Sequence, residues 1–361
     1  MPADRRAERQ AALRALLAAE GVDALLVTHL PNIRYLTGFT GSAALLLLRH
    51  DGAVLFTDFR YATQAPAEVG DAAAVEIDAA SVWDRLREAC ASRPEETVGF
   101  EAHALTVRDA GRLKKCAPRT APVGELVEEL RTVKAPEEVA AIEAAASLAT
   151  AALAEVLPTI CPGQSELLVA SRLEAALRRR GSEWHPFQTI VASGPRSALP
   201  HAHTTERVIE PGEFLLIDFG AQVDGYCADL SRTVVVGGRA DDRQRTIYEA
   251  VRAAQLRARE EIRAGMTGRE ADALARDLLA ARGLAEAFGH SLGHGLGLEV
   301  HEAPRLSTTS ASVLPVGAVV TIEPGLYLPG WGGVRLEDDI VLTAAGPRML
   351  SDGLTDLVEL V

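Results

Sequence analysis

The stretch EFLLIDFGAQVDGYCADLSRTVVV, residues 213–236, decides the fold of the second half of this chain. Alternating apolar residues stand on both sides of the pair Asp224-Gly225. An Asp-Gly pair between two such runs is a strong short-range signal for a β-hairpin with a two-residue loop. We therefore expect two antiparallel strands joined by a tight turn.

The two-residue loop also predicts which residues face each other across the hairpin. With Asp224 and Gly225 in the loop, Gly220 faces Asp229, and Asp218 lies one pleat away on the same face as Gly220. Asp218 and Asp229 are then diagonal neighbours, within side-chain reach of one ion cluster. Both stand where a half-buried strand would ordinarily carry an apolar residue, so an ionised pair is costly there unless cations neutralise it.

Three further motifs downstream carry residues of similar chemistry. VVTIEPGLY (319–327) ends a β-branched strand on Glu323, and GGVRLEDDIVLT (332–343) carries Glu337 in another strand. His294 lies in GHSLGHGLGLEVHE (289–302), whose glycines argue against a helix. Each residue alone has an ordinary interpretation: an Asp beside a turn caps that turn, and the acidic run 337–339 is a solvated strand end.

Together these residues predict a metal centre. Four carboxylates and one imidazole form a ligand set that suits two divalent cations held side by side. Two such cations would balance about four negative charges, whereas the cluster without metal would repel itself. The chemistry indicated is metal-assisted hydrolysis. The ligand set consists of Asp218, Asp229, His294, Glu323 and Glu337.

The motifs IDFGAQVDGYCADLSRT, HSLGHGLGLEVHE, TIEPGLY and GGVRLEDD resemble, in order and wording, the signatures of the pita-bread metallopeptidases. That family includes prolidase, aminopeptidase P and methionine aminopeptidase. The resemblance implies that Asp218 binds one metal, that Asp229 and Glu337 bridge both, and that His294 and Glu323 complete the shell of the second. It favours Mn(II), although Co(II) and Zn(II) also accept such a set.

The resemblance also implies residues that handle the substrate. His201, in ALPHAHTT, and His301, in LEVHE, correspond to the family's substrate-handling histidines, and His290 would wall a proline pocket. Arg335 resembles an arginine that either meets the substrate or steadies the metal ligands. As catalytic residues, Glu323 would carry a proton to the leaving nitrogen, and His201 and His301 would donate hydrogen bonds to the oxyanion.

Length and pattern predict two domains, with a boundary near residue 125. Residues 1–125 alternate helical and strand patterns, which indicates an α/β domain. The phrases NIRYLTGFTGSAALLLL and FTDFRYATQA resemble the N-terminal domain of creatinases, prolidases and aminopeptidases P, which methionine aminopeptidases lack. Residues 126–361 contain long helical patterns at 137–157 and 243–263, each followed by a shorter one at 165–180 and 268–282. This repetition predicts an α+β pita-bread (creatinase/methionine aminopeptidase-like) catalytic domain with two pseudo-twofold αβ halves.

The composition of the chain limits the classes of binding partner to be expected. The chain has 37 basic and 50 acidic residues and a net charge of −13, and it has no basic stripe, so neither nucleic acid nor an anionic membrane is an expected partner. The amino terminus lacks the pattern of a signal peptide, and no stretch reaches the 18 or more apolar residues of a membrane span. Four scattered cysteines indicate reduced thiols and a cytoplasmic protein. The resemblance implies a homodimer.

The function expected is a dinuclear-metal Xaa-Pro dipeptidase (prolidase) acting on small proline-containing peptides. The alternative is an Xaa-Pro aminopeptidase (aminopeptidase P) that releases the N-terminal residue from longer peptides, and no single residue separates the two. A creatinase-like hydrolase without metals would require replaced ligands, and none is replaced. A non-catalytic binding module would have no use for an intact carboxylate cluster.

Overall fold

The computed structural model describes residues 4–78, 81–351, 353 and 355–361. The chain forms two compact units, Met1–Arg131 and Thr132–Val361. The division falls at the end of a short helix, α6 (Leu126–Thr132). The boundary near residue 125, which the sequence suggests, lies at the start of that helix and stays a prediction.

The first unit is built on a six-stranded sheet in the order β4-β3-β2-β1-β5-β6. Its strands are β1 (Ala24–Val27), β2 (Ala44–Arg49), β3 (Gly52–Asp58), β4 (Ala74–Asp78), β5 (Thr97–Glu101) and β6 (Arg119–Val123). Its other helices are α1 (Arg6–Glu20), α2 (Leu30–Thr37), α3 (Gln64–Val69), α4 (Val82–Ala91) and α5 (Val107–Cys116). Strand β2 runs antiparallel to both neighbours, while β5 is parallel to β1 and β6. The predicted α/β architecture is therefore observed.

The second unit contains two αβ halves. The first half has α7 (Pro136–Val156), α8 (Glu166–Arg179), β7 (Ile190–Ser193), β8 (Glu213–Val223) and β9 (Tyr226–Val236). The second has α9 (Asp242–Glu261), α10 (Gly268–Ala281), β10 (Gly293–Gly295), β11 (Glu302–Leu306), β12 (Val319–Ile322), β15 (Asp338–Thr343) and β16 (Gly346–Met349). Each predicted helix lies within a few residues of its expected range.

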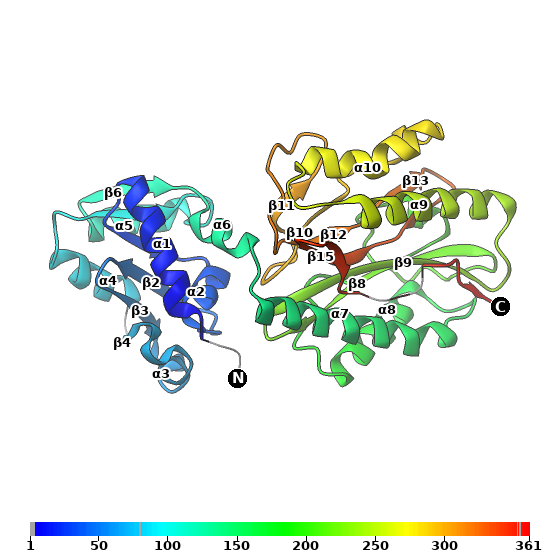
Figure 1. Ribbon diagram of the computed structural model, residues 1–361. Helices are drawn as coiled ribbons and strands as arrows, with labels where there is room; N and C mark the ends of the chain where they lie inside the picture. Colours follow the sequence, from blue (N-terminus) through cyan, green and yellow to red (C-terminus); the bar gives the residue numbers. More distant parts are fainter. Residues whose placement is uncertain (1–3, 79–80, 352, 354) are drawn as a thin grey trace. The chain divides into compact units, whose positions relative to one another are not determined.

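The strands of the second unit lie between the two helix pairs, with α7 and α8 on one side and α9 and α10 on the other (Figure 1). One sheet has the order β17-β9-β8-β7, where β17 is Glu359–Leu360, and the other has the order β11-β10-β12-β15-β16. A small ribbon pairs β13 (Gly325–Leu328) with β14 (Gly332–Arg335). This two-halved arrangement is the one that the repeated helical pattern predicts.

The hairpin β8–β9 forms as the sequence predicts. Val223 pairs with Tyr226, and Gly220 pairs with Asp229. Asp224 has a φ of 50° and the following glycine a φ of 78°, the left-handed values that a tight two-residue hairpin turn requires. Local turn chemistry therefore sets the register of the longest strand pair in the second unit, and with it the positions of both aspartates.

Helix α7 is the main apolar helix of the second unit. Pro136 stands in its first turn, where a missing N–H costs nothing. By length and composition alone, the 24 residues Pro136–Thr159 could cross a membrane, although Glu143 and Glu155 interrupt the apolar run, so no uninterrupted stretch of 18 apolar residues is present there. Ala145, Ala149 and Ala152 are fully buried in one cluster with residues of β8 and β9, so packing on the sheet accounts for the apolar composition.

Candidate metal centre

The two hairpin aspartates lie on adjacent strands inside the second unit. Asp218 in β8 pairs with Ser231, and Asp229 in β9 pairs with Gly220, which makes the aspartates diagonal neighbours. Both are buried. The Oδ1 atom of each carboxylate is buried, and it has no hydrogen-bond partner in the part of the chain that the structure describes. Buried polar oxygens rarely stay unpaired, so both atoms are candidates for ligation.

Three further residues reach the aspartates from the second half of the unit. The backbone N–H of Glu337, directly before β15, donates to Ser231 O at 3.1 Å, and Ser231 Oγ donates to Glu337 Oε2 at 2.7 Å. His294, in β10, has its Nε2 atom 3.7 Å from Asp229 Oδ2 and 3.4 Å from Glu323 Oε1. Ligand atoms of Asp229, His294 and Glu337 all lie within 4.8 Å of one another.

The electrostatics of this cluster are those of a cation site. Burial, and then repulsion from neighbouring carboxylates, raise the pKa of Glu337 to about 8 and hold the pKa values of Asp229 and Glu323 well above their ordinary ranges. Asp218 is among the repelling charges for all three. Burial lowers the pKa of His294 to about 4, so its imidazole is neutral, as a metal ligand must be. The residues present therefore fit divalent cations.

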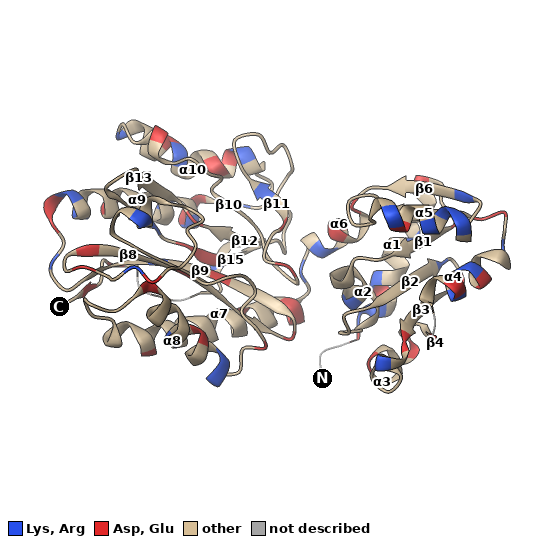
Figure 2. Ribbon diagram, turned by 180° about the vertical axis from the view of Figure 1, so that it is seen from behind, with Lys and Arg blue, Asp and Glu red and all other residues tan. Residues whose placement is uncertain are grey.

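The acidic run that follows Glu337 is not a solvated strand end, so that ordinary interpretation is wrong. Glu337, Asp338 and Asp339 are 2%, 1% and 0% exposed, and Figure 2 shows acidic residues at β15, among the strands between the helix pairs. Asp338 is neutralised by Arg232 at 2.7 Å and Arg259 at 3.0 Å. Asp339 Oδ2 accepts the backbone N–H of Asp229 at 3.1 Å. Asp339 therefore holds in place the part of β9 that carries the candidate ligand Asp229.

Arg335 lies inside the protein, and each of its three guanidinium nitrogens donates a hydrogen bond. Its Nη2 donates to Asp218 Oδ2, Nε donates to Ser231 Oγ at 2.8 Å, and Nη1 donates to Tyr327 Oη at 2.8 Å and to the carbonyl of Pro200 at 3.0 Å. The resemblance implies two possible roles for this arginine, and the geometry favours the one in which it holds a metal ligand in place over the one in which it contacts the substrate.

The predicted substrate-handling histidines surround the same centre. The ring of His301 lies 4.4 Å from that of His294, between centroids, and its side chain is exposed. The Nε2 atom of His290 lies 2.9 Å from Tyr327 Oη. His201 is exposed and is near enough to His290 and His301 to lower the pKa of each when it is charged. The structure thus brings these histidines close to the carboxylate cluster.

One basic residue at the site was missed by sequence reasoning. Arg305, in β11, is the cross-strand partner of His294. It is exposed, and its charge contributes to the lowered pKa values of His294 and His301. Its only sequence signal was its place four residues after His301, on the strand that leaves the glycine-rich motif.

Comparison with known proteins defines the class to which this fold and site belong. The sequence model described as metallopeptidase family M24 matches residues 140–344, and the one described as the creatinase/prolidase N-terminal domain matches residues 9–133. The chain belongs to metallopeptidase family M24. It is an α/β N-terminal domain joined to a pita-bread metallopeptidase domain, as the sequence motifs predicted.

Individual relatives match over nearly the whole chain. An uncharacterized peptidase of Bacillus subtilis is 43% identical over 96% of this chain and 98% of its own length. The Xaa-Pro dipeptidase of Pyrococcus horikoshii is 36% identical over 93% and 95%. Among solved structures, an Xaa-Pro dipeptidase from Bacillus anthracis has a TM-score of 0.95 at 41% identity, covering 98% of this chain and 100% of that one. An X-Pro aminopeptidase from Thermotoga maritima has a TM-score of 0.90 at 35% identity, covering 97% and 99%.

Proposed function

We propose that this protein is a dinuclear-metal Xaa-Pro dipeptidase that cleaves the bond before proline in small peptides. The observation that carries the proposal is the buried cluster of carboxylates around His294, whose charge has no sufficient counterpart unless cations bind. Relatives named Xaa-Pro dipeptidase support the choice of substrate. Release of free proline from Ala-Pro by the metal-loaded protein, and its loss on chelation, is the direct test.

The proposed ligands divide between two metal sites. Asp218 would hold one metal, Asp229 and Glu337 would bridge both, and His294 and Glu323 would complete the other. When bound, divalent metals supply an activated water near neutral pH and polarise the scissile carbonyl. We favour Mn(II) over Co(II) and Zn(II). Metal analysis of protein purified without added metal, followed by reconstitution with each ion, tests this choice.

The chain's own residues would position the peptide and move a proton. Glu323, at the edge of the cluster, would take up a proton at a carboxylate oxygen and deliver it to the leaving ring nitrogen. That nitrogen belongs to a tertiary amide, which has no N–H of its own. His201 and His301 would donate hydrogen bonds to the carbonyl oxygen as it gains charge. His290, held by Tyr327, would form a wall against the proline ring.

Arg305 favours a dipeptidase over an aminopeptidase. A dipeptide carries its free carboxylate next to the scissile bond, and a longer peptide carries it further away. Arg305 is exposed beside His294 and His301, and among the described residues its side chain has no hydrogen bond or ion pair, so its charge is available for such a carboxylate. Incubation with Ala-Pro and Ala-Pro-Ala separates the alternatives, because cleavage of the tripeptide alone would establish the aminopeptidase.

The remaining proposals concern partners and location. We propose a cytoplasmic homodimer that takes small proline-containing peptides and binds neither nucleic acid nor membrane, with domains at 1–125 and 126–361. Acidic net charge supports the absence of nucleic-acid binding. Light scattering coupled to gel filtration tests the dimer, and proteolysis that releases a stable fragment from near residue 126 tests the boundary.

A further inference from the structure

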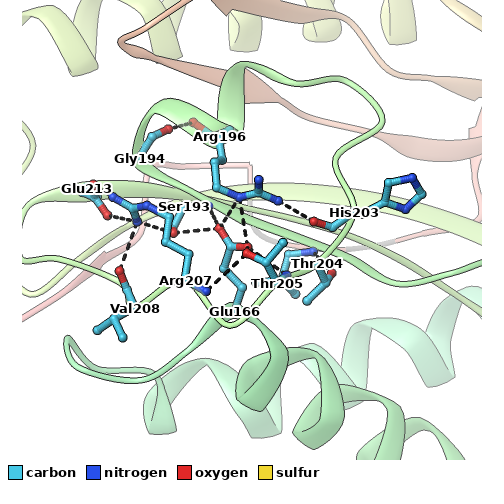
Figure 3. Close-up of polar contacts among 12 residues, drawn as sticks. Glu166, Ser193, Gly194, Arg196, His203, Thr204, Thr205, Arg207, Val208 and Glu213 are labelled. Carbon is cyan, nitrogen blue, oxygen red and sulfur yellow. Dashed lines mark hydrogen bonds and ion pairs between the residues drawn. The ribbon is translucent and has the colours of Figure 1, made fainter.

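A buried carboxylate outside the metal centre holds the loop that carries His201. The loop leaves the sheet at the end of β7, passes through the short helix η4 (Gly194–Ala198), and returns by Thr205 and Arg207 before β8 begins. Figure 3 shows both ends of this loop converging on Glu166, which stands in the first turn of α8. Glu166 is 0% exposed, and neither the ligand set nor the substrate residues include it.

Each oxygen of Glu166 binds one end of the loop. Oε1 accepts the backbone N–H of Ser193 at 2.8 Å and its hydroxyl at 2.9 Å. Oε2 accepts the backbone N–H of Thr205 at 3.1 Å and its hydroxyl at 2.7 Å. Arg196 Nε donates to both oxygens, at 3.1 and 3.2 Å, and its Nη2 donates to the carbonyl of His203. The Glu166 carboxylate therefore joins the segment where the loop leaves the sheet to the segment where it returns.

Neighbouring charges make this junction nearly neutral. Arg207 donates to Ser193 Oγ at 2.6 Å and forms a two-bonded ion pair with Glu213 at 2.6 and 2.8 Å. Two arginines, Arg196 and Arg207, thus face two carboxylates, Glu166 and Glu213. Charge-assisted hydrogen bonds such as these resist local opening more than neutral ones do.

The loop that carries His201 presents two groups to the metal centre. His201 lies near its tip, and the carbonyl of Pro200 accepts from Arg335 Nη1 at 3.0 Å, while the same arginine binds the ligand Asp218. Within the tip, the backbone is held by turn bonds from Leu199 N to Arg196 O and from Ala202 N to Leu199 O. The position of the exposed His201 side chain therefore depends on the fixed ends of the loop.

We propose that Glu166 is a positioning residue for peptide hydrolysis, acting through the loop that presents His201. The inference rests on the proposed function for its catalytic consequence. It predicts that weakening the Glu166 junction moves a substrate-handling histidine more than the metal ligands, because among the described residues no hydrogen bond of Glu166 reaches the ligand set directly and the loop is linked to Asp218 through Arg335.

The test uses the full-length Mn(II)-loaded protein and Glu166→Gln, which replaces one acceptor oxygen with an amide N–H₂ facing hydrogen-bond donors. Thr205→Val, which removes a single hydroxyl, is the milder second variant if Glu166→Gln fails to fold. Arg179→Met, on the same helix but in a surface pair with Glu155, is the matched control. We expect unchanged metal content, faster amide exchange in peptides covering 196–205, and a loss in kcat/KM for Ala-Pro of about 10- to 100-fold, since small misplacements carry such costs.

A double-variant cycle separates positioning from general destabilisation. If Glu166 acts through His201, adding Glu166→Gln to His201→Ala should cost less than about threefold, because coupled residues are non-additive. Equal losses in both backgrounds, or loop exchange unchanged from wild type, would overturn the inference. Failure of the proposed function is a separate result: wild-type protein would release no proline, and the exchange measurement alone would then decide whether Glu166 orders the loop.

Discussion

The Nε2 atom of His294 lies 3.4 Å from Oε1 of Glu323, and the other ring nitrogen lies 2.9 Å from the carbonyl oxygen of Gly295. A carbonyl only accepts hydrogen bonds, so Nδ1 carries the ring proton and Nε2 directs its lone pair toward the carboxylates. With the pKa of His294 lowered to about 4, the imidazole itself holds no second proton near neutral pH. Its lone pair can be matched by a bound cation or, without metal, by protons on the neighbouring carboxylates, and this exchange leads to the first two predictions.

Removal of metal should make stability depend steeply on pH. The pKa of Glu337 is raised from 4.5 to about 8 in the folded protein, so between these values the folded state holds a proton that the unfolded state has released. Stability of the metal-free protein is then highest below about pH 4.5 with respect to this group and falls as pH rises toward 8. Melting temperatures from pH 5 to 9, with chelator and with saturating Mn(II), measure the effect. The same slope with and without metal would contradict the assignment of the cluster.

Neutralising a proposed bridging ligand should have opposite effects on the stability of the metal-free protein and on its activity. Glu337→Gln and Asp229→Asn remove a buried negative charge, so each is expected to raise the melting temperature of the metal-free protein at pH 8. Each should also lower metal content and reduce hydrolysis of Ala-Pro by more than about 100-fold, the upper loss seen when only an outer partner of a ligand is changed. Asp224→Asn, in the exposed turn of the same hairpin, is the matched control, with metal content and rate unchanged.

Replacement of Arg305 should affect only substrates with a carboxylate beside the scissile bond. We expect Arg305→Met to raise KM for Ala-Pro by about 10-fold, the loss of one charge-assisted hydrogen bond, and to leave the rate on Ala-Pro-amide unchanged. Steady-state kinetics on the two substrates provide the measurement. An equal loss of activity on the two substrates would show that Arg305 does not bind the substrate carboxylate. Arg305 would then no longer favour a dipeptidase over an aminopeptidase.

The buried ion pair of Lys134 and Glu302 should be costly to break. Lys134 Nζ lies 2.8 Å from Glu302 Oε2, with side-chain exposures of 1% and 6%. Lys134→Met leaves the carboxylate buried without this partner, at a cost of about 3–5 kcal/mol in the free energy of unfolding. Arg257→Met, in a surface pair with Glu261, should cost less than about 1 kcal/mol. Urea unfolding monitored for the second unit compares the two, and equal effects would contradict the prediction.

The sequence by itself determined the elements and one half of the site. The Asp224-Gly225 turn and the two-residue period of the strands fixed the pairing of Gly220 with Asp229, because both are local properties of the backbone. Helical periodicity and Pro136 similarly predicted α7. The other three candidate ligands were assigned from a motif resemblance, because the local sequence does not specify which distant segments lie together in the fold.

Only the tertiary structure decided the electrostatic state of these residues and their supporting contacts. Asp338 and Asp339 have the sequence signature of a solvated strand end, yet long-range packing buries both beside the centre. Glu166 joins α8 to a loop about thirty residues away, and Lys134 joins the start of the second unit to the strand after His301. Burial and charge pairing depend on which segments lie together in space, and desolvation then sets their consequences for pKa and stability.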